Sequence, residues 1–218
     1  FTPDKIDYTV ITHVMHSFAW PDEEGNILHY DNMLSQSVTN TVHDNGAKIL
    51  LCLGGWGQSW GFSASMSTPE LREIFIDNII SICETYHYDG VDIDWEQPAN
   101  STEKNNLTTF IAELRQAFDD LYPDWIISMA VPVSNWSGQY YDFSQLKQSV
   151  EFFNAMTYDM HGTWTDHAGH NSPLYQSPPG DPDGSVNTGI NYLVNTRGIE
   201  SQKVNVGIPF YGKEYNAS

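Results

Sequence analysis

The sequence contains few basic residues. Lysine and arginine together number 9, against 28 aspartate and glutamate residues, and the formal net charge is −19. A chain with this excess of negative charge repels polyanions such as nucleic acid and anionic membrane surfaces. We therefore expect neither nucleic acid nor a membrane as a partner, and a neutral polymer or small molecule fits better.

Cysteine and long apolar runs are also scarce. Two cysteines in 218 residues do not make a disulfide framework. Both lie in apolar patterns, so we predict buried free thiols at Cys52 and Cys83. No apolar run is long enough to cross a membrane, and no signal peptide stands at Phe1. The chain opens close to its first apolar strand, which is consistent with a processed product.

Short apolar runs alternate with longer helical patterns along the chain. The predicted strands are residues 10–19, 47–53, 90–95, 125–131, 152–157 and 203–209. The predicted helices are residues 32–43, 69–86, 102–121, 143–150 and 184–196. This alternation is typical of an α/β fold in which helices cover a parallel sheet. The length suits one domain or part of a larger one, so residues 1–218 are expected to form a single unit of structure.

Two α/β architectures compete, an open doubly wound sheet and a (β/α) barrel. No Gly-x-Gly-x-x-Gly turn follows the first predicted strand. The dinucleotide-binding form of the open sheet, and a dehydrogenase function with it, therefore loses its main support. We favour the barrel.

Three acids alternate with apolar residues in the strand at 90–95 and just beyond it. Because successive strand side chains point to opposite faces, Asp92, Asp94 and Glu96 share one face. In a barrel this face lines the interior, with Glu96 at the carboxyl end of the strand, where barrel enzymes hold their chemistry. Like charges and burial raise the pKa of at least one such carboxyl, as a general acid for glycoside cleavage requires.

Other interpretations of the acidic strand are weaker. An exposed amphipathic strand would show the same alternation. A calcium loop needs glycine at its sixth position, whereas Gly90 comes second after Asp89. Metal binding is not predicted elsewhere either, because the spacing of His161, His167 and His170 matches no zinc motif.

These residues resemble family 18 glycoside hydrolases, the chitinase family, whose signature is Asp-Gly-x-Asp-x-Asp-x-Glu. Asp89 through Glu96 match every position of it. Residues 11–19, 52–56, 128–132, 156–162 and 206–212 are similar to motifs of the family's second, third, fifth, sixth and seventh strands. The resemblance thus implies a (β/α)8 TIM barrel of which strands two to seven are present, and a further chain or segment would complete the barrel. Cys52 replaces the usual serine, which removes a hydroxyl donor to the innermost acid, and Lys213 replaces a common arginine.

The resemblance implies chitin or N-acetylglucosamine oligosaccharides as substrate, cleaved by an endo-acting, secreted enzyme without cofactor or metal. In the family's substrate-assisted retaining mechanism, Glu96 would be the acid and base, and Asp94 would orient the acetamide and share a proton with Asp92. Tyr158 would donate to the acetamide oxygen. Asp89 would have a structural role. The implied substrate contacts are Asp159, Met156, Trp56, Phe18 and Tyr211.

Two relatives of the same fold remain as alternatives. One is a chitinase-like lectin, which binds sugar without cutting it and typically lacks the acid at the position of Glu96. The other is an endo-β-N-acetylglucosaminidase acting on N-glycans, which often lacks one of the inner acids, Asp92 and Asp94.

Overall fold

The computed structural model describes residues 2–176, 178 and 182–215. It divides into two compact units. Residues 1–129 and 140–151 form the first unit, and residues 130–139 and 152–218 form the second. Each unit is described by itself.

Parallel strands dominate the first unit. The strands are β1 (His13–Pro21), β2 (Ile27–His29), β3 (Lys48–Gly54), β4 (Gly90–Asp94) and β5 (Ile126–Val131), whose last two residues belong to the second unit. β1, β3, β4 and β5 pair in parallel in that order, and β2 pairs antiparallel with the outer side of β1. The four strands predicted in this part of the chain are confirmed. β2 was not predicted, because three residues are too few to show a pattern.

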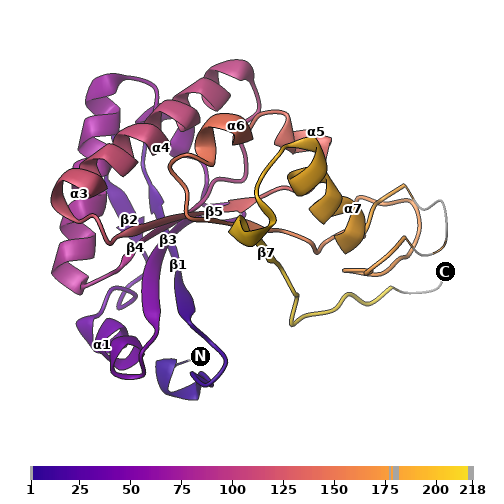
Figure 1. Ribbon diagram of the computed structural model, residues 1–218, viewed down its shortest axis with the longest axis horizontal. Coiled ribbons are helices and arrows are strands. Elements are labelled where there is room, and N and C mark those ends of the chain that lie inside the picture. Colours follow the sequence, from indigo (N-terminus) through magenta and orange to yellow (C-terminus); the bar gives the residue numbers. More distant parts are fainter. Residues whose placement is uncertain (1, 177, 179–181, 216–218) are drawn as a thin grey trace. The chain divides into compact units, whose positions relative to one another are not determined.

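The helices of the first unit follow the predicted alternation. They are α1 (Gln36–Asp44), α2 (Phe62–Ser65), α3 (Pro69–Tyr86), α4 (Ser101–Leu121) and α6 (Phe143–Leu146). In Figure 1, α3 and α4 lie side by side along one side of the strands. Both start at side-chain caps: the Thr68 hydroxyl accepts from the Leu71 N–H, and the Asn100 side chain accepts from two N–H groups. α1 begins four residues later than predicted, because Ser35 is still extended at its N-cap.

An aromatic layer behind β4 forms much of the first unit's core. The Trp95 ring stacks on Phe62 with centroids 5.5 Å apart, and Phe75 stacks on Phe110 at 4.9 Å. All four side chains are buried. Full burial of each large apolar side chain contributes about 1.5–3 kcal/mol. Trp95 therefore points to the helix layer, as the alternation in β4 predicts.

The second unit contains β6 (Phe152–Ala155) and β7 (Val204–Val206), which pair in parallel. Its helices are α5 (Asn135–Gly138) and α7 (Val186–Asn191), which continues as a π-helical turn over Tyr192–Thr196. Both strands are shorter than predicted. After Ala155 the chain turns, and the Ala155 carbonyl accepts from the N–H groups of Thr157 and Gly207, which ends the regular ladder.

One further prediction is confirmed: Cys52 and Cys83 are buried free thiols. Among the described residues, every helix is either too short or too polar to cross a membrane.

Candidate active site

The innermost acid of β4 is held by side chains from the two flanking strands. Cys52 of β3 and Ser128 of β5 lie opposite Asp92 in the parallel registers, so all three side chains share one face. The Asp92 carboxylate accepts from Cys52 Sγ at 3.1 Å through Oδ2 and from Ser128 Oγ at 2.5 Å through Oδ1. Asp92 is only 3% exposed. Two donors therefore stabilise its negative charge inside the unit.

The hydroxyl lost at Cys52 is replaced by a thiol that donates to Asp92. Burial is the largest cause that raises the pKa of the Cys52 thiol, followed by the charges of Asp92 and Asp94. The group therefore stays protonated and donates its S–H to Asp92. A thiol is a weaker donor than a hydroxyl, but the hydrogen bond is kept.

Asp94 is the next acid on the same face of β4. It is 8% exposed, and its Oδ1 has no hydrogen-bond partner among the described residues. Burial raises the pKa of Asp94 to about 8, with further contributions from the charges of Glu96 and Asp92. Asp94 is therefore protonated at neutral pH and can donate a hydrogen bond.

Glu96 lies two residues beyond the end of β4 and is half-buried. Its backbone N–H donates to Ser59 Oγ at 2.9 Å, and the Asp94 carbonyl accepts from the Gly55 N–H at 2.8 Å. The loop after β3 thus fixes the turn that carries Glu96. Gly54 permits this approach: its φ is +114°, and a Cβ atom there would lie 2.1 Å from the Asp94 carbonyl oxygen. Sequence reasoning missed Ser59, since no local pattern marks a residue that acts 37 positions away.

Two aromatic candidates flank the acids of the first unit. The Phe18 ring packs against the backbone of Gly55, where an added Cβ would meet it at 2.8 Å. Trp56 follows directly and is 82% exposed. An exposed indole beside a polar site provides a flat apolar surface of the kind on which sugar rings stack.

Asp89 lies at the opposite end of β4. Its Oδ2 accepts from the Ile49 N–H at 2.7 Å and from His43 Nε2 at 2.8 Å. These bonds join α1, β3 and β4, in agreement with the structural role expected for Asp89.

The second unit groups three of the other candidates. The rings of Tyr158 and Tyr211 meet edge to face, with centroids 6.3 Å apart. The Tyr211 hydroxyl donates to Asp159 Oδ2 at 2.9 Å, and Lys213 Nζ lies 2.6 Å from Asp159 Oδ1. Both oxygens of the Asp159 carboxylate are therefore held by residues that follow β7.

The backbone beneath Tyr158 is also fixed from β7. Thr157 Oγ1 donates to the Gly207 carbonyl at 2.7 Å. A Cβ at Gly207 would lie 2.7 Å from Tyr158 Cε1, so only glycine allows the ring this position. Met156, the last candidate, is half-buried, and its N–H donates to the Val131 carbonyl at 3.0 Å.

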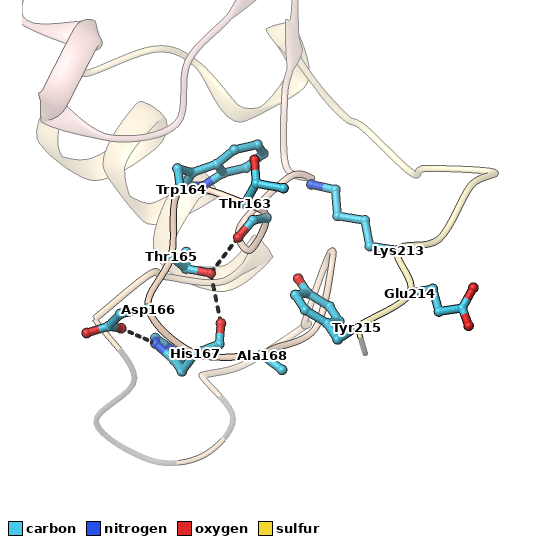
Figure 2. A pocket seen from close by; sticks show the side chains of 10 residues that line it. Thr163, Trp164, Thr165, Asp166, His167, Ala168, Lys213, Glu214 and Tyr215 are labelled. Carbon is cyan, nitrogen blue, oxygen red and sulfur yellow. Dashed lines mark hydrogen bonds and ion pairs between the residues drawn. The ribbon is translucent and has the colours of Figure 1, made fainter. Parts of the chain in front are cut away.

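Lys213 is a further functional candidate whose position the sequence could not give. Besides Asp159, its ammonium donates to the His161 carbonyl at 2.6 Å and lies 4.4 Å from the centroid of the Trp164 ring. It lines a pocket of about 790 Å³ together with Trp164, Tyr215 and residues 165–168 (Figure 2). A cation over an aromatic face contributes about 0.5–2 kcal/mol, so Lys213 orders this pocket.

The candidates thus form two sets. Asp92, Asp94, Glu96, Phe18 and Trp56 lie in the first unit. The second unit holds Tyr158, Asp159, Met156 and Tyr211.

Comparisons with known proteins agree with one family. The model of glycosyl hydrolases family 18 matches residues 2–218. A probable endochitinase of Caenorhabditis elegans is 30% identical over 98% of this chain and 38% of its own length. An endochitinase of Manduca sexta is 32% identical over 95% of this chain and 41% of its own length.

Solved structures give the same result. The Group IV chitinase of Ostrinia furnacalis, also crystallised with allosamidin, has a TM-score of 0.88 and 30% identity over 96% of this chain and 61% of its own. This similarity confirms the predicted fold class, a (β/α)8 barrel of which this chain holds a part. The chain spans 10–58% of the length of the curated relatives it matches most strongly.

Proposed function

Because the chain belongs to glycosyl hydrolases family 18, we propose that it is an endo-acting chitinase that hydrolyses β-1,4 linkages between N-acetylglucosamine units. One observation carries the proposal: Glu96 follows β4 two residues after Asp94, whose pKa burial raises to about 8. In this pair Glu96 supplies the proton, and Asp94 accepts a hydrogen bond from the group that becomes positively charged. Relatives named endochitinase, and related structures with chitin oligosaccharides, support this substrate.

The proposed reaction is substrate-assisted and retains the anomeric configuration. Glu96 gives its proton to the glycosidic oxygen as the bond to the anomeric carbon breaks. The acetamide oxygen of the same sugar attacks that carbon and forms an oxazolinium ion. Glu96, now a carboxylate, takes a proton from water as the water opens the ring and restores the acetamide.

The other two acids act through charge and hydrogen bonding. Asp94 accepts a hydrogen bond from the acetamide N–H and shares its proton with Asp92 as charge develops on the ring. The donors from Cys52 and Ser128 keep Asp92 in place below it. The three acids therefore titrate as a coupled set, and activity depends on more than one pKa.

The remaining candidates bind the sugar. Tyr158 donates its hydroxyl to the acetamide oxygen, and Asp159, held by Tyr211 and Lys213, contacts the same sugar unit. Trp56 supplies a stacking surface for a neighbouring sugar, and Phe18, Met156 and Tyr211 form apolar walls.

The test compares release of a fluorophore from an N-acetylglucosamine oligosaccharide by the wild type, Glu96→Gln and Glu73→Gln. Glu73 lies exposed on α3, so its variant removes the same charge away from the candidate site. We expect Glu96→Gln to lose activity by about 10²–10⁴-fold, the usual contribution of a general acid, and Glu73→Gln to keep it.

Other outcomes separate the alternatives. Equal activity in all three proteins would refute the role of Glu96. No activity in any folded sample, with oligosaccharide binding retained, would support a sugar-binding protein. Cleavage of an N-glycan in preference to chitin oligosaccharides would support an endo-β-N-acetylglucosaminidase.

Two wider proposals depend on this function. A further chain or segment completes the barrel, as the family resemblance implies. The enzyme is secreted, because an insoluble polymer such as chitin has to be cut where it lies, outside the cell.

A further inference from the structure

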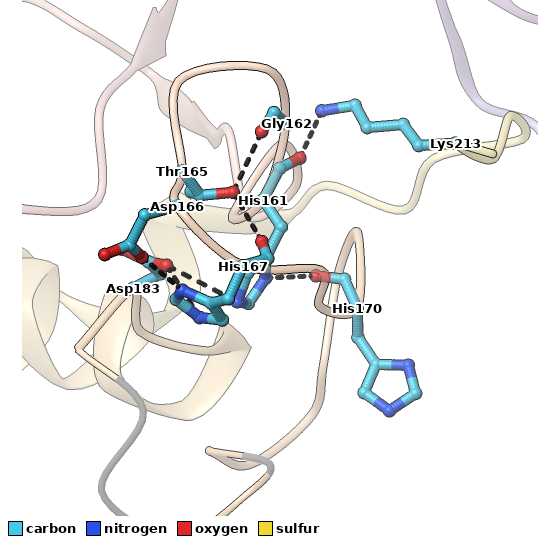
Figure 3. Close-up of polar contacts among 8 residues, drawn as sticks. All are labelled: His161, Gly162, Thr165, Asp166, His167, His170, Asp183 and Lys213. Atoms are coloured by element: carbon cyan, nitrogen blue, oxygen red, sulfur yellow. Dashed lines mark hydrogen bonds and ion pairs between the residues drawn. The ribbon is translucent and has the colours of Figure 1, made fainter. Parts of the chain in front are cut away.

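Three side chains with metal-ligand chemistry converge in the loop between β6 and α7. His161 and His167 come from the start of the loop and Asp183 from its end (Figure 3). Both imidazoles turn Nε2 toward the same atom: each lies 3.4 Å from Asp183 Oδ2. His161 is fully buried, whereas the side chains of His167 and Asp183 are 38% and 26% exposed. The cluster thus has a buried inner ligand and an edge open to solvent.

The second ring nitrogen of each histidine, Nδ1, already makes a hydrogen bond to an oxygen, which orients the ring. His161 Nδ1 lies 2.8 Å from the His170 carbonyl, and His167 Nδ1 lies 2.8 Å from Asp166 Oδ1. A carbonyl oxygen only accepts, so the His161 Nδ1 carries the hydrogen, and a carboxylate imposes the same tautomer on His167. In each neutral ring Nε2 is then the lone-pair nitrogen, and it faces a carboxylate oxygen. Histidines that bind metals are oriented in this way.

The spacing fits a tetrahedral ion. Ligand bonds of 2.0–2.1 Å to zinc give tetrahedral edges of about 3.4 Å. Octahedral coordination at the same bond length gives edges of about 2.9 Å. The two edges to Asp183 Oδ2 are 3.4 Å, longer than the usual direct N–H···O hydrogen bond. All three ligand atoms lie within 4.8 Å of one another, and the partly exposed His167 can move to close the third edge.

We propose that His161, His167 and Asp183 bind a divalent transition-metal ion, with Zn²⁺ the best fit. Two imidazoles and one carboxylate suit zinc and disfavour calcium and magnesium, which take oxygen ligands. Water fills the fourth position at the exposed edge, as in zinc sites with three protein ligands.

The ion would tie together the two ends of the loop. It would fix His161, whose carbonyl accepts from Lys213, and Lys213 in turn pairs with Asp159. The metal site would therefore steady the residues of the second unit that line the pocket with Lys213. It does not depend on the proposed hydrolysis, and its test uses no substrate.

The test is titration of untagged full-length protein with Co²⁺, followed by its visible absorption, and competition by Zn²⁺. We expect one strongly absorbing, four-coordinate Co²⁺ per chain, displaced by Zn²⁺. His167→Ala and Asp183→Asn should each weaken binding by about 100-fold or more, because loss of even an outer-shell partner costs 10–100-fold. His170→Ala is the matched control, since His170 contributes only its backbone carbonyl and its ring points away from the cluster (Figure 3).

A second measurement reports on the loop itself. Tyr175 lies between His167 and Asp183 in the sequence and is 65% exposed. Because the ion would hold both ends of this segment, chymotrypsin should cut at Tyr175 more slowly when Zn²⁺ is present. The proposal is overturned if the folded wild type binds no Co²⁺ at millimolar concentration. It is also overturned if both ligand variants, with native circular dichroism, bind as tightly as the His170→Ala control.

Discussion

Asp94→Asn should make the folded chain more stable, and increasingly so as the pH rises. The pKa of Asp94 is about 8 in the folded state against a reference value of 3.8. The folded state therefore keeps a proton that the unfolded state releases above pH 4. By linkage, the site contributes fully to stability below pH 4, and this contribution is lost as the pH rises toward 8. Asparagine cannot ionise, so the variant does not suffer this loss.

The size of the stability difference follows from the number of pH units between the two pKa values of Asp94. Each pH unit inside it lowers the free energy of unfolding by about 1.4 kcal/mol. From pH 4 to pH 7 the wild type thus loses up to about 4 kcal/mol that Asp94→Asn retains. Titrations of groups that do not interact with Asp94 cancel in the difference.

The assay is urea unfolding of both proteins at pH 4, 5, 6 and 7. Asp124→Asn, an exposed site before β5, makes the same chemical change as a control. The difference between Asp94→Asn and wild type should grow by up to about 1.4 kcal/mol per pH unit, and the control difference should stay flat. A difference for Asp94→Asn that does not change with pH would refute the raised pKa and the chemistry built on it.

Two further substitutions test the support beneath the acids, again by urea unfolding. Gly54→Ala places a Cβ 2.1 Å from the Asp94 carbonyl oxygen at a φ of +114°, so we expect the free energy of unfolding to fall by about 3 kcal/mol or more. Gly57→Ala is the control: its φ is +87°, but the added Cβ would meet no atom outside the neighbouring residues within 4 Å, so the loss should be only about 1 kcal/mol. Equal losses would show that the contact is relaxed in solution. Cys52→Ala removes a donor to Asp92 and should cost about 1–3 kcal/mol, whereas Cys52→Ser keeps a donor and should cost less. The reverse order would exclude the thiol hydrogen bond.

The parts predicted well from the sequence are those governed by local periodicity. The two-residue repeat in β4 placed Asp92 and Asp94 on one face and Trp95 on the other, and the helical spacing of apolar residues located α3 and α4 to within one residue at their start. The strand and helix order followed from the same patterns. These features depend on neighbours within a few positions, which a sequence displays directly.

The contacts that the sequence did not predict join residues far apart in the chain. Ser59 binds the Glu96 N–H across 37 positions, and Lys213 reaches Asp159 from beyond β7. The histidine cluster was missed because its third member, Asp183, lies 16 residues after His167, outside any metal motif with regular spacing. Such contacts are created by folding, so composition and spacing carry no signal for them.

The acidic face of β4 costs stability, and its apolar face offsets that cost. Keeping Asp94 buried and neutral at pH 7 costs up to about 4 kcal/mol relative to the ionised, solvated group. Behind it, Trp95 and Phe62 are buried, and each contributes about 1.5–3 kcal/mol. A strand with only a structural role would not need a buried acid on one face. If Asp94→Asn proves both more stable at pH 7 and inactive, the buried acid is retained for chemistry; if it proves more stable and fully active, the acid has no role in catalysis and the proposed part of Asp94 fails.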